Sequence, residues 1–118
     1  MRSDRTRRVN EALREVLSAR IAGGLKDPRV GFVTVTAVDT SPDFSHARVY
    51  VSVLGGEEER DSTLEGLESS RGFLQNGLAR ELRIKRTPQL QFLNDDALEH
   101  GMRISRLLDE HGGETPSA

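Results

Sequence analysis

Cationic side chains gather shortly before the last strand that the sequence predicts. Arg80, Arg83, Lys85 and Arg86 lie close together, with Glu81 as the single carboxylate among them. Arginine donates paired hydrogen bonds to phosphate oxygens, which suits it to binding polyanions. The alternative is that these cations only offset the dipole of a helix C-terminus, which needs fewer of them. We therefore predict an RNA-binding surface with these four residues as its main contacts.

Charge is segregated along the rest of the sequence. The formal net charge is −2, yet residues 1–29 hold eight Arg or Lys against four Asp or Glu. Residues 57–68 instead hold six carboxylates and one arginine. Such segregation lets an acidic protein present a cationic face to RNA, unless the blocks interleave in space and cancel. Arg7, Arg8 and Arg29 lie in the first basic block and are secondary candidates for RNA contacts.

Residue patterns for catalysis or metal binding are sparse. Asp95 and Asp96 precede His100, a set that would suit a small metal-dependent hydrolase, but adjacent carboxylates at a helix start are more simply caps. The chain has no cysteine, so disulfides and thiolate metal sites are excluded. There is no Walker loop and no dinucleotide fingerprint. We expect no catalytic residues, no metal, no cofactor and no small-molecule substrate.

Length and composition suggest one small soluble domain. With 118 residues the chain has room for one modest core. No apolar run approaches the ~20 residues that a membrane-spanning helix needs, and no apolar stretch follows the charged N-terminus. One tyrosine and four phenylalanines argue against a platform of stacked aromatic side chains. We expect a cytoplasmic monomer without membrane contacts.

Apolar spacing predicts a helix over residues 4–22. Ser3 or Asp4 serves as its cap, and Gly23 and Gly24 end it. The apolar residues recur at helical intervals and form one stripe: Val9, Leu13, Val16, Leu17 and Ile21.

Three strands follow from β-branched and alternating runs. Residues 32–38 and 47–54 predict an antiparallel pair joined by the turn residues 39–45, and residues 89–93 predict a short third strand after Pro88. In the second run, one set of alternate positions is expected to face the core: Ala47, Val49, Val51 and Val53. The other set is expected to be solvated, or covered by something that is not very apolar: Arg48, Tyr50 and Ser52.

A broken helix pair fills the connection to the third strand. Residues 57–61 are mostly acidic and predict a solvated loop, after which Ser62 and Glu65 have capping-box spacing. Ser70 and Gly72 predict a kink, because glycine inside a helix costs about 1 kcal/mol relative to alanine. The second helix of the pair then ends in the cations described above, with a stop at the proline before the strand.

The order of elements is therefore helix, strand, strand, helix, kink, helix, strand. This order predicts an α+β fold, a two-layer sandwich in which helices cover one face of a three-stranded sheet. Asn94, Asp95 or Asp96 is expected to cap a further C-terminal helix. Residues 1–110 then form one domain, and residues 111–118 form a polar disordered tail.

Several motifs in this order extend over nearly the whole chain. They are Arg7-Arg8-Val9, Leu25-Lys-Asp-Pro-Arg-Val-Gly31, Ala47-Arg-Val-Tyr-Val51, Gly72-Phe-Leu74, Leu82-Arg-Ile-Lys-Arg-Thr-Pro88 and Asp95-Asp-Ala-Leu-Glu-His-Gly-Met-Arg-Ile104. With these motifs the chain resembles the ribosome-binding factor A family, which has a KH domain of type II topology. KH domains generally clamp RNA with a Gly-x-x-Gly loop, which is absent here. The family similarly lacks that loop and has a small-x-Gly kink instead, which reads Ser70-Arg71-Gly72 in this chain.

The resemblance implies a non-enzymatic assembly factor. Such a protein binds the immature small ribosomal subunit, contacts its ribosomal RNA, and aids late maturation and 5′-end processing of that RNA, including during growth in the cold. Two other functions stay open from the residues themselves. One is a protein–protein adaptor whose basic helix end docks onto an acidic partner. The other is general single-strand binding of the KH type, which the missing Gly-x-x-Gly loop opposes.

Overall fold

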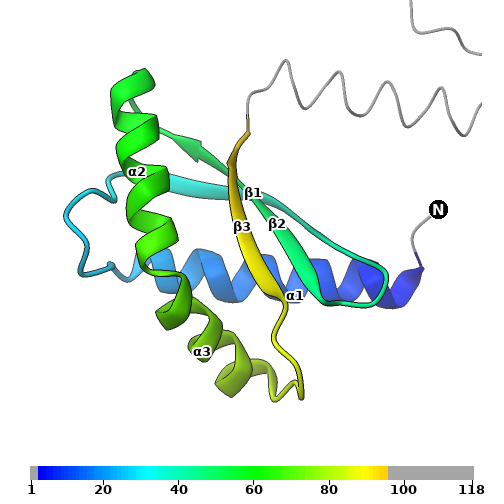
Figure 1. Ribbon diagram of the computed structural model, residues 1–118. Coiled ribbons are helices and arrows are strands. Elements are labelled where there is room, and N and C mark those ends of the chain that lie inside the picture. Colours follow the sequence, from blue (N-terminus) through cyan, green and yellow to red (C-terminus); the bar gives the residue numbers. More distant parts are fainter. Residues whose placement is uncertain (1–2, 96–118) are drawn as a thin grey trace, which may run out of the picture.

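The helices and strands follow one another in the order that the sequence predicts. The computed structural model describes residues 3–95 (Figure 1). The elements are α1 (Asp4–Ala22), β1 (Val33–Thr40), β2 (His46–Val53), α2 (Glu57–Ser69), α3 (Arg71–Leu82) and β3 (Gln89–Asn94). The α+β class is thereby confirmed. The predicted C-terminal helix, the domain boundary at residue 110 and the tail over 111–118 lie outside the described residues.

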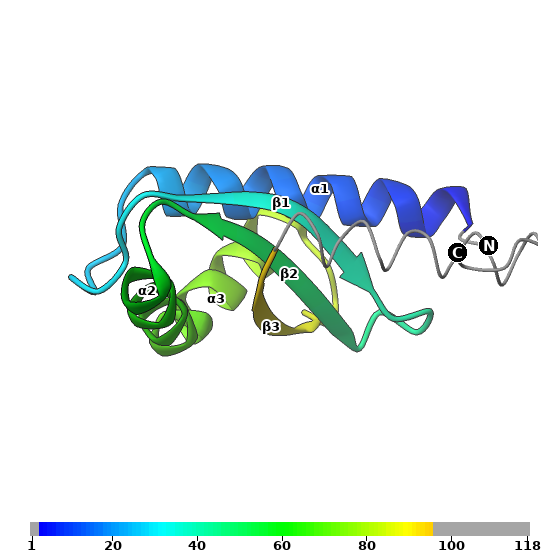
Figure 2. The same ribbon diagram turned by 90° about the horizontal axis from the view of Figure 1, so that it is seen from above.

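The strands form one mixed sheet in the order β1–β2–β3. The first pair is antiparallel and the second pair is parallel. In the parallel pair Ala47 lies beside Leu90 and Val49 lies beside Phe92, so both strands turn apolar side chains to one face. Figure 2 shows the central strand β2 between the other two, with the β1–β2 turn at the same end as the start of α1.

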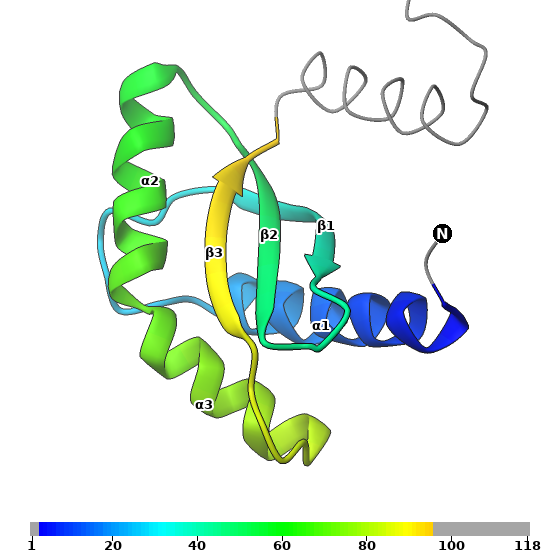
Figure 3. The ribbon, with the colours of Figure 1, turned by 45° about the vertical axis from the view of Figure 1, so that its right-hand side comes forward.

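All three helices pack on that apolar face. In Figure 3, α1 runs behind the strands, and α2 lies beside β3. Each leucine that is fully buried here adds about 1.5–3 kcal/mol of hydrophobic stabilisation. One cluster combines the sheet with the helices, and its helical members are Leu13, Leu17 and Ile21 from α1, Leu67 from α2, and Leu74 and Leu78 from α3.

Polar contacts fix the N-terminal half of α1. The Ser3 hydroxyl accepts a hydrogen bond from the Thr6 backbone N–H at 3.1 Å, which caps the helix as the sequence predicts. The Asn10 side-chain oxygen accepts from both the backbone N–H and the hydroxyl of Thr40, at 3.0 and 2.6 Å. Because Thr40 ends β1, these bonds tie the helix to the end of the sheet.

The predicted start of the second helix is wrong. Helix α2 begins at Glu57, so the acidic run expected to be a loop forms the first turn of a helix, and Ser62 lies inside it. The Glu59 carboxylate accepts a hydrogen bond from the backbone N–H of Gly56 at 2.7 Å. Three glutamates in the first turn also stabilise the helix through its dipole. The acidic run was therefore a better indicator of the helix start than the capping-box spacing of Ser62 and Glu65.

The interruption between the two helices lies at Ser70. Its φ of −91° and ψ of 3° are outside the helical region, and α3 resumes at Arg71. Gly72, predicted as part of the kink, instead lies in the first turn of α3, where nothing would come within 4 Å of an added Cβ. The Ser70 N–H donates to the carbonyls of Gly66 and Leu67, so the chain turns without losing its hydrogen bonds.

The second face of β2 is not fully solvated. Tyr50 was expected either in solvent or under a cover that is not very apolar, and it is 8% exposed. Its register partners are Ala37 on β1 and Leu93 on β3, both half-buried, so an apolar strip crosses this face. Arg48 and Ser52 are exposed as expected. Alternation along one strand did not reveal the strip, because its members come from three strands.

Two glycines allow close approaches between elements. At Gly66 in α2, an added Cβ would lie 2.7 Å from Val30 Cγ2 and 3.3 Å from the Val30 backbone nitrogen. The loop between α1 and β1 therefore packs directly on α2. At Gly77 in α3, an added Cβ would overlap the guanidinium of Arg20. Helices α1 and α3 meet there, and Arg20 Nε is 3.2 Å from Glu81 Oε2.

The Gly66→Ala variant tests the first of these contacts. We expect it to lower the free energy of unfolding by about 1–3 kcal/mol, because the new methyl group overpacks against backbone and side-chain atoms. Urea denaturation measures the change. The control is Gly72→Ala, which has open space around it and should be neutral or stabilising by up to about 1 kcal/mol. Equal stability of the two variants would contradict the close packing at Gly66.

Candidate nucleic-acid interface

Cations from two distant segments line one open groove. We call it the basic groove; its volume is about 580 Å³. It lies between the N-terminal half of α1, the β1–β2 turn and the loop that follows α3. Its lining residues are Arg5, Arg8, Val9, Ala12, Leu13, Asp43, Phe44, Leu82, Ile84, Lys85, Arg86 and Pro88.

The α1 side of the groove combines cations with apolar side chains. Arg5, Arg8 and Ala12 follow one another at helical spacing, so they lie on the same side of α1. Arg8 was a secondary candidate, whereas Arg5 was not predicted. The guanidinium carbon of Arg5 lies 5.2 Å from the centroid of the Phe44 ring, a cation–π contact between the helix and the turn. The spacing could have indicated Arg5, but no sequence signal connects it with Phe44.

The β1–β2 turn holds Phe44 in a strained conformation. Phe44 has a φ of +60°, in the left-handed region, where a bulky residue costs about 1–2 kcal/mol. Its N–H donates to the Ser41 carbonyl at 2.9 Å, which closes the turn. The Asp43 carboxylate accepts hydrogen bonds from the Ser45 hydroxyl, the Ser41 hydroxyl and the Ser45 backbone N–H. These bonds hold the pKa of Asp43 well below its usual range and stabilise the turn.

The main predicted cations lie mostly on a loop. Helix α3 ends at Leu82 with Arg83 as its cap, so Arg83 lies at the predicted helix end, whereas Lys85 and Arg86 lie on the loop beyond it. Arg83 caps α3 with a φ of +52°, which turns the chain away from the helix axis. Arg80 lies in the last turn, where its charge offsets the helix dipole. The structure brings Lys85 and Arg86 to the basic groove, while Arg80 and Arg83 lie outside its lining.

Ion pairing divides the arginines into two groups. In the first, each guanidinium pairs with a carboxylate: Arg7 with Asp4, Arg14 with Glu11, Arg20 with Glu81, Arg29 with Asp27 and Arg71 with Glu68. In the second, no carboxylate within residues 3–95 pairs with the cation, and its members near the groove are Arg5, Arg8, Arg80, Arg83, Lys85 and Arg86. All six are exposed. These six cations are therefore available to an anionic ligand.

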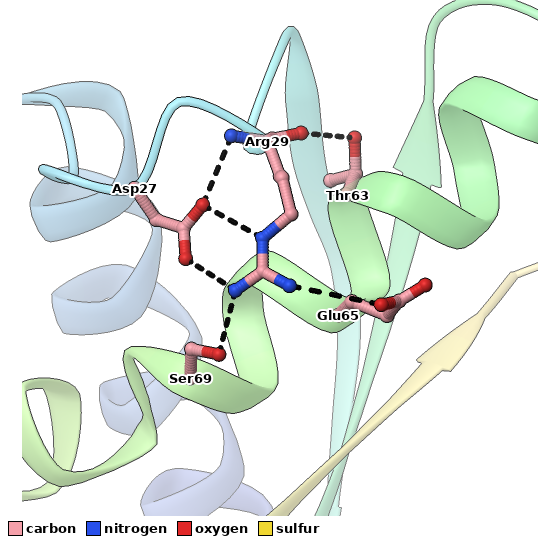
Figure 4. Close-up of polar contacts among 5 residues, drawn as sticks. All are labelled: Asp27, Arg29, Thr63, Glu65 and Ser69. Carbon is pink, nitrogen blue, oxygen red and sulfur yellow. Dashed lines mark hydrogen bonds and ion pairs between the residues drawn. The ribbon is translucent and has the colours of Figure 1, made fainter.

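Arg29, a secondary RNA-binding candidate, is held on the surface by neighbouring side chains of the protein (Figure 4). Its guanidinium donates to both oxygens of Asp27, at 3.0 and 2.6 Å, and to the Ser69 hydroxyl at 2.8 Å. Glu65 is a further partner at 3.6 Å. Arg29 thus ties the loop between α1 and β1 to α2. Arg7, the other secondary candidate, pairs with Asp4 at 2.9 Å on the exposed surface and does not line the groove.

A second hollow extends the cationic surface beyond Arg86. It has a volume of about 360 Å³ and its lining includes Arg71, Gln75, Arg86 and His46. Gln75 accepts a hydrogen bond from the Leu90 backbone N–H at 3.1 Å, which holds β3 against α3. Arg86 lines both hollows, so the second hollow adjoins the basic groove and reaches the start of α3.

Of the residues considered for hydrolysis, the structure describes Asp95 alone. Asp95 accepts a hydrogen bond from the Thr36 hydroxyl at 2.5 Å, and Asp96 and His100 lie outside the described residues. In residues 3–95 no group of three or more His, Cys, Asp or Glu side chains is arranged to hold a metal. No helix in that part of the chain has the length and apolar composition needed to cross a bilayer.

The element order, the mixed sheet and the helices on one face define a KH-like fold. The sequence model of the Ribosome-binding factor A family matches residues 5–108. A ribosome-binding factor A from Geobacter metallireducens is 46% identical over 110 residues, covering 93% of each chain. The chain therefore belongs to the ribosome-binding factor A family.

Solved structures agree with this assignment. The crystal structure of ribosome-binding factor A from Thermus thermophilus has a TM-score of 0.68 and 35% identity, covering 75% of this chain and 93% of that chain. A homology model of the Thermus thermophilus factor, fitted into the cryo-EM map of a 30S complex, has a TM-score of 0.62 and 37% identity. It covers 74% of this chain and 91% of that chain.

The Asp27–Arg29 contact predicts a specific acid sensitivity. The Arg29 guanidinium, and then its backbone N–H, lower the pKa of Asp27 from 3.8 to about 2. A lowered pKa in the folded state stabilises the fold above the unfolded value, and this stabilisation disappears as the pH falls. We expect the free energy of unfolding to drop more steeply between pH 4 and pH 2 in the wild type than in Asp27→Asn. Denaturation at several pH values measures this dependence of the free energy of unfolding on pH.

The control for this experiment is Asp61→Asn, which removes an exposed carboxylate from α2. It should keep the wild-type pH dependence. The same slope in Asp27→Asn as in the wild type would show that the contact does not hold the loop in solution.

Proposed function

We propose that this chain is a non-enzymatic assembly factor that binds the immature small ribosomal subunit through its ribosomal RNA. In that role it aids late maturation and 5′-end processing of the RNA, as a monomer and without a cofactor. Membership of the ribosome-binding factor A family supports the proposal, as does the Thermus thermophilus relative fitted into a 30S complex.

The observation that carries the proposal is the gathering of cations that pair with no carboxylate within residues 3–95. Arg5 and Arg8 come from the first helix, and Lys85 and Arg86 come from the loop before the last strand, yet all four line one groove. Opposing them is one acidic residue of the lining, Asp43, whose carboxylate is already hydrogen-bonded within its turn. A surface that gathers free cations in an acidic protein suits a polyanion.

Phosphate contacts account for binding without sequence reading. Arginine and lysine on a rigid fold position the protein on folded RNA by shape and charge. Each phosphate contact releases counterions, so the log–log dependence of affinity on salt has a slope of about −0.7 per contact on single strands and about −0.9 on B-form DNA duplex. The number of cations engaged can therefore be measured directly.

Charge reversal at the loop tests the proposal. We expect Lys85→Glu/Arg86→Glu to lose most binding to immature small subunits and to reduce the magnitude of the salt slope by about 1.4–1.8, because two phosphate contacts disappear. Co-sedimentation at low and high salt measures both effects. Cells carrying only this variant should accumulate small-subunit RNA with an unprocessed 5′ end.

The matched control is Lys26→Glu/Arg60→Glu, which makes the same charge change away from the groove and should bind as the wild type does. Equal loss of subunit binding in both double variants would show that the overall charge, and not the groove, determines binding. Binding that survives RNase treatment of the subunits would favour the adaptor function, with an acidic protein as the partner.

A further inference from the structure

The floor of the basic groove is apolar, which phosphate binding alone does not require. Cations stand on both sides, and between them lie side chains that the fold leaves partly exposed. The half-buried apolar members of the lining are Val9, Ala12, Phe44, Leu82 and Ile84. A ligand that fits this surface has an apolar body between anionic groups.

We infer that the basic groove holds one unpaired nucleotide of the bound RNA, with its base on the apolar floor and its flanking phosphates at the cationic rims. The inference rests on the proposed function and narrows the ligand to RNA with an extruded base. An unpaired base offers two apolar faces, and the phosphates on either side of it carry the negative charges that Arg5, Arg8, Lys85 and Arg86 match.

The wall formed by Arg5 and Phe44 favours a flat ligand. The guanidinium lies 5.2 Å from the ring centroid, so a planar cation and an aromatic ring stand together beside the apolar floor. Bases stack on aromatic rings and on arginine guanidinium planes. An acidic amphipathic helix would also suit the charges, but it would gain nothing from this planar pair.

Backbone strain is concentrated beside the same groove. Among the described residues, the non-glycine residues with positive φ are Phe44 and Arg83. Phe44 lies in the turn on one side, and Arg83 joins α3 to the loop on the other. Asparagine or glycine would relieve the strain at a turn position such as that of Phe44. A bulky aromatic residue kept in that conformation indicates a role for its ring.

The experiment compares three RNA hairpins that differ at one position. The first carries a single unpaired nucleotide, the second has an abasic site in its place, and the third is fully paired. Dissociation constants of the full chain are measured for each by fluorescence anisotropy at one salt concentration. We expect the wild type to bind the unpaired nucleotide about tenfold more tightly than the abasic site, from stacking of the base.

Two variants and one control locate the base. Phe44→Asn removes the ring at a position where asparagine relieves strain, so the free energy of unfolding should not fall. Ile84→Ser removes part of the floor. Both variants should bind the unpaired and abasic hairpins equally. Phe32→Asn is the matched control: Phe32 is 81% exposed and outside the groove, and the variant should keep the tenfold preference.

Each contrary result has a distinct meaning. Equal wild-type affinity for all three hairpins, with salt-dependent binding lost in Lys85→Glu/Arg86→Glu, would overturn the base site and leave the proposed RNA binding intact. Absence of binding to any hairpin at low salt would overturn the inference. It would also contradict RNA binding as a part of the proposed function. Binding to subunits that needs Phe44 and Ile84, without discrimination between the hairpins, would overturn it in favour of a protein occupant.

Discussion

The close packing of α1 against α3 is the constraint on which the basic groove depends. Gly77 has no side chain, so Arg20 can lie across α3 and pair with Glu81 at 3.2 Å. Together with the buried leucines of both helices, this contact holds the C-terminal half of α1 beside α3. At the other half of α1, Asn10 accepts two hydrogen bonds from Thr40 and fixes the helix to the sheet. The first turns of α1 therefore face the loop after α3 because the rest of the helix is held.

The cationic side chains of this acidic protein have two different roles. Paired arginines such as Arg20 and Arg29 join elements that are distant in sequence, and the carboxylates that neutralise them are drawn from α2 and α3 as well as from the loop after α1. The cations at the groove have no such partners within the described residues, so they repel one another in the free protein. Strain at Phe44 and Arg83 adds to this cost. Stability lost at a surface in this way is typical of a site that is relieved by its ligand.

Local sequence patterns predicted the helices and strands well, but they could not predict contacts between residues that are distant in the sequence. The stripe through Leu13 and Leu17 identified α1, and alternation through Val49 identified the core face of β2, because helical and strand periodicity directly reflect burial. The start of α2 was misplaced since two capping signals competed. The apolar strip around Tyr50 was not predicted because its other members lie on other strands.

The same distinction applies to the candidate site: residues with a local charge signal were predicted, whereas contacts with distant residues were not. Lys85, Arg86 and Arg8 were found from local charge, and the structure places all three at one groove. Arg29 was included on charge alone, although its partners Glu65 and Ser69 come from α2 and are invisible in a local pattern. Phe44 was missed because its meaning depends on the distant Arg5 and on a backbone angle.

The parallel pairing of β2 with β3 has a consequence for biosynthesis. The antiparallel β1–β2 pair needs only a short turn and can form as soon as both strands are made, whereas β3 must wait for α2 and α3. Lys85 and Arg86 immediately precede β3, so their half of the groove is placed only when that strand docks. A nascent chain that has folded as far as β2 carries Arg5 and Arg8 but lacks the opposite rim. Among the described elements, the groove is thus completed only when β3 docks, and a chain that ends before β3 lacks half of the groove's cations.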